Sequence, residues 1–253
     1  MSHKGQSVLG ARINTLSWEE AIGQILTWGA AHESRYVSLC NVHSVVTTTR
    51  DPEFKIVINN ADMSAPDGAP VAWALRHLGY TSQQRISGPD LMWRYLSRAE
   101  RLGQSVFFYG STDATLDKLK KSVARQFPQL LVCGTCSPSF QTQTAEEDVA
   151  EVEAINRSGA NVVFIGLGCP KQERWMAAHC GRIHAVMIGV GAAFDYHAGT
   201  VRRAPIWWQE HGLEWLYRLY SEPRRLFKRY LVTNTLFVIG IVRQLLASRV
   251  PAK

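Results

Sequence analysis

The chain has 253 residues, of which 46% are hydrophobic and 19% charged, with a formal net charge of +7. These fractions exclude a disordered or collagen-like chain, and the length suits one large α/β domain or two small ones. Acidic and basic residues balance over residues 1–199, so the whole basic excess lies in residues 200–253. That segment also carries eight of the 25 aromatic residues. It must therefore bury apolar surface against the body, a partner or a membrane.

Cysteine usage and hydropathy indicate the cellular setting. The five cysteines are too few and too scattered for a disulfide framework, and the N-terminus lacks the pattern of a signal peptide. We therefore expect a reducing, cytoplasmic setting. The most apolar stretch is 231–247, and its uninterrupted apolar core is only 236–242. Because a spanning helix needs roughly 18 apolar residues, we expect no segment to cross a bilayer.

Short β-rich runs alternate with longer helical patterns along the first 190 residues. In chain order we expect helix Trp18–His32, strand Tyr36–Cys40, helices Val71–Leu78 and Asp90–Leu102, strand Val106–Tyr109, helix Ala114–Phe127, strand Leu130–Cys133, helix Ala145–Arg157, strand Val162–Ile165, helix Gln172–Cys180 and strand Ala185–Val190. Continuously apolar strands suit a sheet that is covered on both faces.

The alternation predicts the α/β class, with a Rossmann-like, mostly parallel sheet covered by helices on both faces. Ligands of such sheets bind beyond the carboxyl ends of the strands. We divide the chain into an α/β core, residues 1–199, and a basic, aromatic-rich helical appendage, residues 200–253.

A glycine-rich turn follows the strand that ends at Ile165. Gly166 and Gly168 permit close approach of the backbone, and Pro170 near the first helical position leaves free N–H groups facing the turn. With Lys171 beside it, this helix N-terminus is a candidate diphosphate cradle. The alternative is a tight strand-to-helix connection that holds no ligand.

A second turn, from Gly189 through Gly191 to Asp195, is close to the dinucleotide fingerprint. Phe194 stands where the third glycine belongs, so we expect it to obstruct close packing of helix on strand. No clean helix is expected directly after the turn. These features disfavour NAD binding.

A third turn holds Asp67 between Pro66 and Gly68, before an apolar helix. Asp67 is either an N-cap, with its pKa kept low by backbone N–H groups, or a general base or sugar ligand. The spacing does not separate these alternatives.

Metal and redox chemistry have little support in the sequence. Cys133 and Cys136 have redox spacing, but we expect them to follow an interior strand and to be ordinary thiols, since no second pair is present for zinc. The histidines show no ligand spacing, and lone ones such as His43 and His77 are more often packed or at the surface. We expect no metal site and no cofactor.

The appendage contains a predicted helix with Ser221 as N-cap and Pro223 in its first turn. A stripe at helical spacing runs along it, beside Arg225 and Arg229, and comprises Leu226, Tyr230, Thr233, Phe237 and Ile241. Such a stripe fits a helix that lies on anionic lipid. Packing on the body or on a second subunit is the alternative, and basic residues interleaved with aromatics also fit nucleic acid.

Several blocks occurring in this order resemble the WecG/TagA/CpsF family of bacterial glycosyltransferases from about residue 8 to residue 230. They are Pro66-Asp67-Gly68, Arg85 to Leu91, Gly166 to Glu173, Gly189 to Gly191 with Phe194-Asp195, Arg203-Ala204-Pro205 and Gly212 to Arg218. The resemblance implies an enzyme that moves a hexose or N-acetylhexosamine from a UDP-sugar to an undecaprenyl-diphosphate-linked sugar. Such enzymes work peripherally at the cytoplasmic face of the inner membrane, in the synthesis of exopolysaccharide, enterobacterial common antigen or wall teichoic acid linkage units.

Roles follow from the resemblance at matching positions. Asp67 matches the family's proposed general base for an inverting transfer, and Asn41, Arg85 and Gln172 match positions that line the sugar-nucleotide pocket. We assign the turn residues to the same pocket; they are Gly166, Gly168, Pro170, Lys171, Gly191 and Asp195. Arg218 and Arg225 match arginines thought to reach the lipid diphosphate, and we add Lys228 and Arg229 for the diphosphate and the membrane. The chain has no DxD motif, and the resemblance implies a metal-independent reaction in which cationic side chains stabilise the leaving UDP.

The chain departs from many relatives at two positions. They carry Asn-x-Glu where this chain has Asn41-Val42-His43, and some carry threonine where it has Leu39. The donor sugar is therefore left open between UDP-glucose and UDP-N-acetylmannosamine types. A homo-oligomer also stays open, nucleic acid is not expected as a partner, and a non-enzymatic membrane- or nucleic-acid-binding module is the alternative function.

Overall fold

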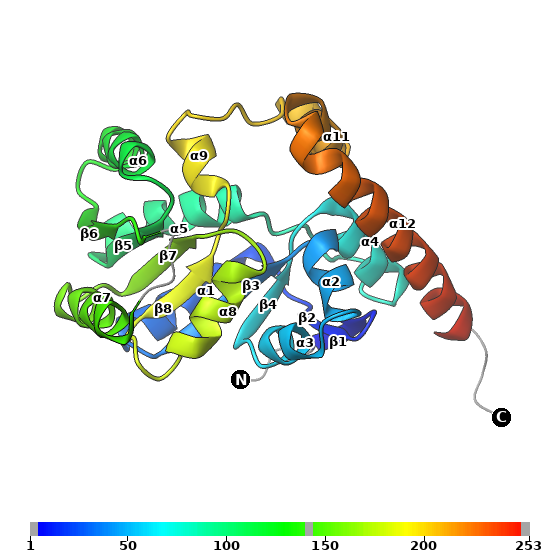
Figure 1. Cartoon of the computed structure of the whole chain (residues 1–253), viewed down its shortest axis with the longest axis horizontal. Coiled ribbons are helices and arrows are strands. Elements are labelled where there is room, and N and C mark those ends of the chain that lie inside the picture. The colour runs from blue at the N-terminus through cyan, green and yellow to red at the C-terminus, as the bar shows by residue number, and fades with distance from the viewer. Residues whose placement is uncertain (1–4, 140–143, 249–253) are drawn as a thin grey trace.

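The computed structural model describes residues 5–139 and 144–248. A six-stranded, all-parallel sheet forms its centre, in the order β4-β3-β8-β7-β5-β6 (Figure 1). The strands are β3 Arg35–Cys40, β4 Met63–Pro66, β5 Ser105–Gly110, β6 Leu131–Cys136, β7 Val162–Gly166 and β8 Val186–Gly189. The predicted α/β class with a mostly parallel sheet is confirmed.

Helices cover both faces of this sheet, as the continuously apolar strands predict. One face is covered by α1 Trp18–Ala30, α5 Gly88–Leu102 and α6 Asp113–Gln126, and the other by α7 Ala145–Arg157 and α8 Lys171–His179. Alternate residues of β7 point to opposite faces of the sheet. Val162 and Phe164 pack under α1, α5 and α6, and Val163 and Ile165 pack under α7 and α8. These helices agree with the predicted ones to within two residues at each end.

The sequence prediction missed the short elements around the first half of the sheet. They are the antiparallel hairpin β1 Gly5–Val8 and β2 Ala11–Asn14, helices α2 Val42–Thr48 and α3 Pro52–Asn59, and β4 itself. The hairpin is tied to β4, because the Ser64 backbone N–H donates to Asn14 Oδ1 at 2.6 Å. Helix α4, Ala69–His77, follows the turn at Asp67.

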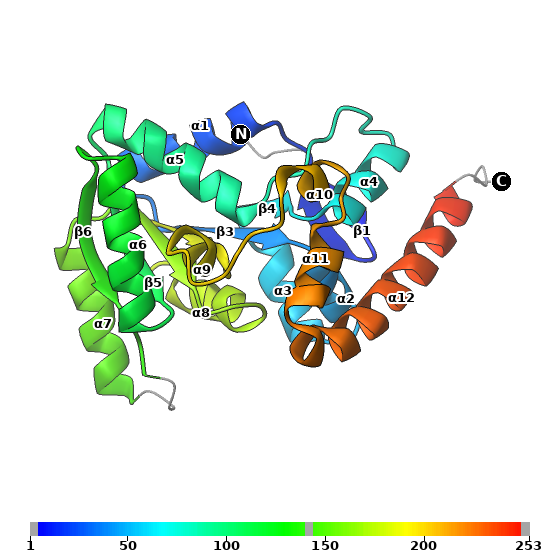
Figure 2. The same ribbon diagram turned by 90° about the horizontal axis from the view of Figure 1, so that it is seen from above.

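The C-terminal segment is helical, as predicted. After the short helix α9 Ala193–His197, residues from 200 on contain α10 Ile206–Glu210, α11 Glu214–Ser221 and α12 Pro223–Ser248 (Figure 2). Ser221 is not the predicted N-cap: it ends α11, and its hydroxyl donates to the Tyr217 carbonyl at 3.0 Å. The division of the chain at residue 200 into core and appendage stays a prediction.

The apolar stripe of α12 faces the body of the protein and not a membrane. Leu226, Phe237 and Ile241 are at most 3% exposed, and the last two join the core cluster that contains Val45 of α2. Further along α12, the Gln244 side chain accepts from the Leu9 backbone N–H at 2.9 Å and donates to the Ser7 carbonyl. Of the alternatives left open for this stripe, the structure shows packing on the body and not the lipid-facing arrangement, because the hairpin and α2, both missed, provide its packing surface.

The opposite side of α12 is apolar and exposed. Over 223–247 the helix is long and apolar enough, by length and composition alone, to cross a membrane. The expectation that no segment crosses a bilayer stays a prediction. That expectation counted only the uninterrupted apolar run, whereas the continuous helix joins it to polar residues such as Thr233 and Asn234.

Two further expectations about turns are wrong. Cys133 and Cys136 lie inside β6, an edge strand, and do not follow an interior one. Phe194 is fully buried without obstructing the packing after β8, because Gly166 leaves room for its ring: a Cβ there would lie 2.6 Å from Phe194 Cδ2. The short helix α9 follows this turn directly.

Candidate active site

A cavity of about 470 Å³ lies at the carboxyl ends of β3, β4, β7 and β8. β3 and β8 are neighbours in the sheet, and their carboxyl ends face the cavity together with those of β4 and β7. Ligands of doubly wound sheets bind beyond the carboxyl ends of the strands. Helices α11 and α12 form the wall opposite the strand ends, so the C-terminal segment completes the cavity.

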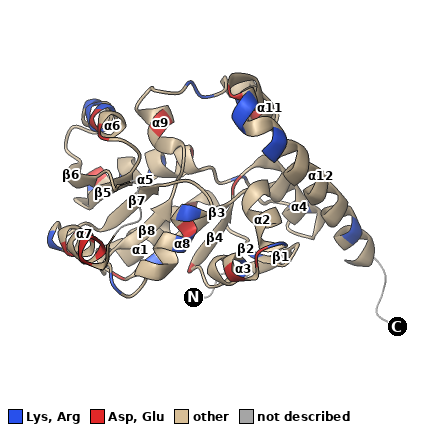
Figure 3. Ribbon diagram, in the orientation of Figure 1, with Lys and Arg blue, Asp and Glu red and all other residues tan. Residues whose placement is uncertain are grey.

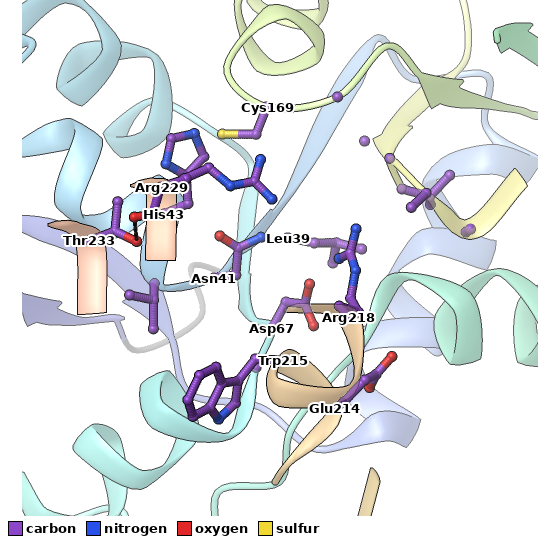
Figure 4. A pocket seen from close by; sticks show the side chains of 18 of the residues that line it. Leu39, Asn41, His43, Asp67, Cys169, Glu214, Trp215, Arg218, Arg229 and Thr233 are labelled. Atoms are coloured by element: carbon purple, nitrogen blue, oxygen red, sulfur yellow. Dashed lines mark hydrogen bonds between the residues drawn. The ribbon is translucent and has the colours of Figure 1, made fainter. Parts of the chain in front are cut away.

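Asp67 lies at the floor of the cavity, directly after β4 (Figure 4). Its backbone N–H donates to the Cys40 carbonyl at 2.9 Å. Gly68, with a φ of 88°, is the N-cap residue of α4, so Asp67 is not the N-cap. Burial raises the pKa of Asp67 from 3.8 to about 6; Arg85 and Arg218 oppose this rise and Glu214 adds to it. A carboxylate with this pKa is suited to accept a proton near neutral pH.

Asn41 lies beside Asp67, at the end of β3 (Figure 4). Its side-chain oxygen accepts from the Ser44 backbone N–H at 3.2 Å and caps α2. The capping fixes the side chain, which leaves the amide nitrogen to face the cavity. A rigid amide donor at this place is suited to a hydroxyl or phosphate oxygen of a ligand.

Gln172, at the start of α8, joins the two glycine-rich turns. Its Oε1 accepts from the backbone N–H groups of Gly168 and Gly191, both at 3.1 Å, and its Nε2 donates to Glu173 Oε1 at 2.9 Å. Gln172 is 4% exposed. Its amide therefore fixes the spacing of the turns after β7 and β8 where they line the cavity.

We expect Gln172→Ala to lower the free energy of unfolding by about 1–3 kcal/mol, because two partly buried N–H groups lose their acceptor. The nucleotide that the sequence resemblance leads us to expect, UDP, should bind less tightly as well, since the two turns are no longer held together. Chemical denaturation and calorimetric titration with UDP measure the two effects. Gln126→Ala, at the exposed end of α6, is the control, and equal stability and UDP affinity in both variants would contradict the role of Gln172.

Cationic side chains line the α11 and α12 wall. Arg218, Arg225 and Arg229 reach the cavity from this side, and Lys171 from the other. Figure 3 shows basic residues where α11 meets α12. Within the described residues, the buried Nε atoms of Arg218 and Arg229 have no hydrogen-bond acceptor. Such unsatisfied donors suit an anionic ligand.

The structure brings most of the predicted site residues together around one cavity. Those on its walls are Asn41, Asp67, Arg85, Gly168, Lys171, Gln172, Gly191, Arg218, Arg225 and Arg229. Four others lie off its walls: Gly166, which packs under Phe194; Pro170; Asp195 of α9, which accepts from the Thr200 hydroxyl after that helix; and the exposed Lys228. The roles of all these residues stay predictions.

Sequence reasoning missed several residues of the walls. Glu214 and Trp215 come from α11, Glu173 from α8, and His43 from α2. His43 lies against Arg229 and Thr233 (Figure 4), and burial together with Arg229 lowers its pKa, which keeps the imidazole neutral at pH 7. The signal that was available for His43 is its place two residues after Asn41.

Among the residues that the structure describes, no three His, Cys, Asp or Glu side chains are grouped as a metal site would require. The positive charges of the cavity come from arginine and lysine.

A parallel sheet with a partly buried carboxylate and a cationic wall beyond its strand ends is typical of an enzyme that acts on an anionic substrate. The sequence model of the glycosyl transferase WecG/TagA/CpsF family matches residues 6–251. The chain belongs to this family, and the protein is a glycosyltransferase of cell-surface polysaccharide synthesis that takes a sugar donor and an acceptor.

Proposed function

We propose that the protein transfers a hexose or N-acetylhexosamine from a UDP-sugar to a polyprenyl-diphosphate-linked sugar, with inversion at the anomeric carbon. The observation that supports this most is the placement of Asp67, with a raised pKa, between the glycine-rich turns and the arginine wall. One side of the cavity then holds the donor and the other the charged end of the acceptor.

In this mechanism the Asp67 carboxylate accepts the proton of the acceptor hydroxyl. The hydroxyl oxygen forms a bond to the anomeric carbon while the bond from that carbon to the UDP oxygen breaks, and UDP leaves with the electron pair. A single displacement with one base inverts the anomeric centre. We assign the charge on the leaving diphosphate to Lys171 and Arg85, and that on the lipid diphosphate to Arg218, Arg225 and Arg229.

We propose a peripheral location at the cytoplasmic face of the membrane. Side chains on the outer side of α12 are exposed and apolar, among them Phe227, Leu231 and Val238. The inner side packs on α2 and the hairpin, so a helix lying on the membrane keeps this packing, whereas a spanning helix would lose it. An acceptor held in the membrane would then meet the cavity beside α12.

A screen of UDP-glucose, UDP-N-acetylglucosamine, UDP-N-acetylmannosamine and UDP-glucuronate, each with a synthetic polyprenyl-diphosphate acceptor, tests the proposal through UDP release. Acceptor-dependent release with one or more donors is the expected result. No release with any donor, together with no thermal stabilisation by UDP, would contradict it. A salt-dependent gel shift with oligonucleotides would then favour the non-enzymatic binding module.

The activity should fall as the pH drops through about 6, because protonated Asp67 cannot accept the hydroxyl proton and burial raises its pKa to about 6. Above this pH the carboxylate form predominates and kcat/KM reaches a plateau. Steady-state rates between pH 5 and 8 measure this dependence. An acid limb of the kcat/KM profile near pH 4, the pKa of an ordinary aspartate, would show that burial does not raise the pKa of Asp67.

A further inference from the structure

A chain of five alternating charges connects the proposed base to the C-terminal segment. Arg85 Nε lies 3.8 Å from Asp67 Oδ1, and Arg85 Nη2 forms an ion pair with Glu214 Oε2. Glu214 Oε1 lies 3.5 Å from Arg203 Nε, and Arg203 holds both carboxylate oxygens of Asp90, at 2.6 and 2.8 Å. The chain therefore joins the turn after β4 to the start of α5 and to α11.

Arg85 stands between two acids and makes its close contact with only one of them. Its hydrogen bond goes to Glu214, whereas 3.8 Å to Asp67 is too long for one. A guanidinium bonded directly to Asp67 would favour the ionised carboxylate and oppose its protonation. The geometry in which Glu214 holds Arg85 leaves Asp67 available as a proton acceptor.

Glu214 is itself fixed in place. Its side chain is 11% exposed at the first turn of α11, with a guanidinium on either side. The charged groups that act on Asp67 are Arg85, Glu214 and Arg218, and the last two lie one turn apart on α11. Helix α11 thus places one negative and one positive side chain toward the base.

We propose that Glu214 is a positioning residue for the transfer reaction: it holds the Arg85 guanidinium away from Asp67, so that seating of α11 sets the strength of the base. This inference rests on the proposed function, in which Asp67 is the base. It makes the C-terminal segment a part of the catalytic apparatus and not only a membrane contact.

Glu214→Gln tests the proposal, because glutamine keeps the size of the side chain but removes the negative charge that holds Arg85. With this ion pair lost, Asp67 is the carboxylate that the ion-pair contacts of Arg85 leave in its reach. We expect the acid limb of the kcat/KM profile to move down by about one pH unit. The plateau kcat should fall about three- to tenfold, since a weaker base accepts the proton less readily. A purely structural loss would lower the plateau without moving the limb.

Asp90→Asn is the second variant. It removes the acid that holds Arg203, so that Arg203 can draw Glu214 away from Arg85. The acid limb of its kcat/KM profile should also move to lower pH. Glu210→Gln, an exposed acid of α10, is the matched control and should keep the wild-type profile. Thermal melts establish that each variant is folded. An unmoved limb in folded Glu214→Gln would overturn the role of Glu214. Asp67→Asn, assayed in parallel, separates the two proposals: if it retains turnover, the proposed base itself is wrong.

Discussion

Asp67→Asn should lower kcat by about 10²- to 10⁴-fold while the fold and the affinity for UDP stay unchanged. Asparagine has nearly the same shape as aspartate, and the backbone contact of residue 67 with the Cys40 carbonyl does not involve the side chain. The amide cannot accept a proton from the acceptor hydroxyl at neutral pH. UDP release with the active donor measures kcat, and thermal melts with and without UDP measure stability and binding.

Asp117→Asn is the control for this substitution, because Asp117 lies on the exposed side of α6, where it pairs only with Lys120 among the ion pairs of the described residues. It should retain the wild-type rate. Near-normal turnover in Asp67→Asn would remove Asp67 from the mechanism. A loss of UDP-induced stabilisation in that variant would instead make Asp67 a donor-binding group.

The long elements could be predicted from the sequence because each carries its own signals. Helix α7 begins at a capping box formed by Thr144 and Glu147, and β7 is a continuously apolar run. The local sequence of helix α2 points to the wrong structure, since Val42–Thr48 is rich in β-branched residues that favour strands. The cap by Asn41 and the packing against α12 make it a helix, and neither is visible in a local window.

Contacts between distant residues explain the errors around the site. Phe194 fits after β8 only because Gly166, 28 residues earlier, has no side chain beneath its ring. Periodicity identified the side of α12 that is buried but not the surface that covers it, which α2 and the hairpin provide.

The candidate site shows the same limit. Asn41 follows a predicted strand, Asp67 stands in the turn between Pro66 and Gly68, and both match positions of the family, so both could be named as candidates from the sequence. Glu214 could not be predicted as a site residue, since its role depends on the ion pair with Arg85, 129 residues away in the chain. Among the residues that the C-terminal segment contributes to the cavity, the sequence identified the arginines Arg218, Arg225 and Arg229, whereas Glu214 is added by the fold.

The exposed side of α12 leads to the second prediction with a large effect. Phe227, Leu231 and Val238 lie on one side of the helix and are 57–60% exposed, with the exposed cations Arg224 and Lys228 beside them. Apolar side chains beside basic ones fit the surface of an anionic bilayer. Replacing all three apolar residues by serine should lower the affinity for vesicles of anionic phospholipid at least about 100-fold, because each contributes about 1.5–3 kcal/mol when buried.

Cosedimentation with phosphatidylglycerol vesicles measures this affinity. The triple substitution is preferable to deletion of residues 200–253, because deletion also removes Glu214 and Arg218 from the cavity and uncovers the core beneath Phe237. Leu102→Ser, at the exposed end of α5, should leave vesicle binding unchanged. Turnover of a water-soluble short-chain acceptor should persist in the triple variant, since these side chains do not line the cavity. Unchanged cosedimentation of the triple variant would mean that this side of α12 is not the membrane-binding surface. If the triple variant also lost turnover of the soluble acceptor, the three side chains would instead be needed for the structure of the cavity wall.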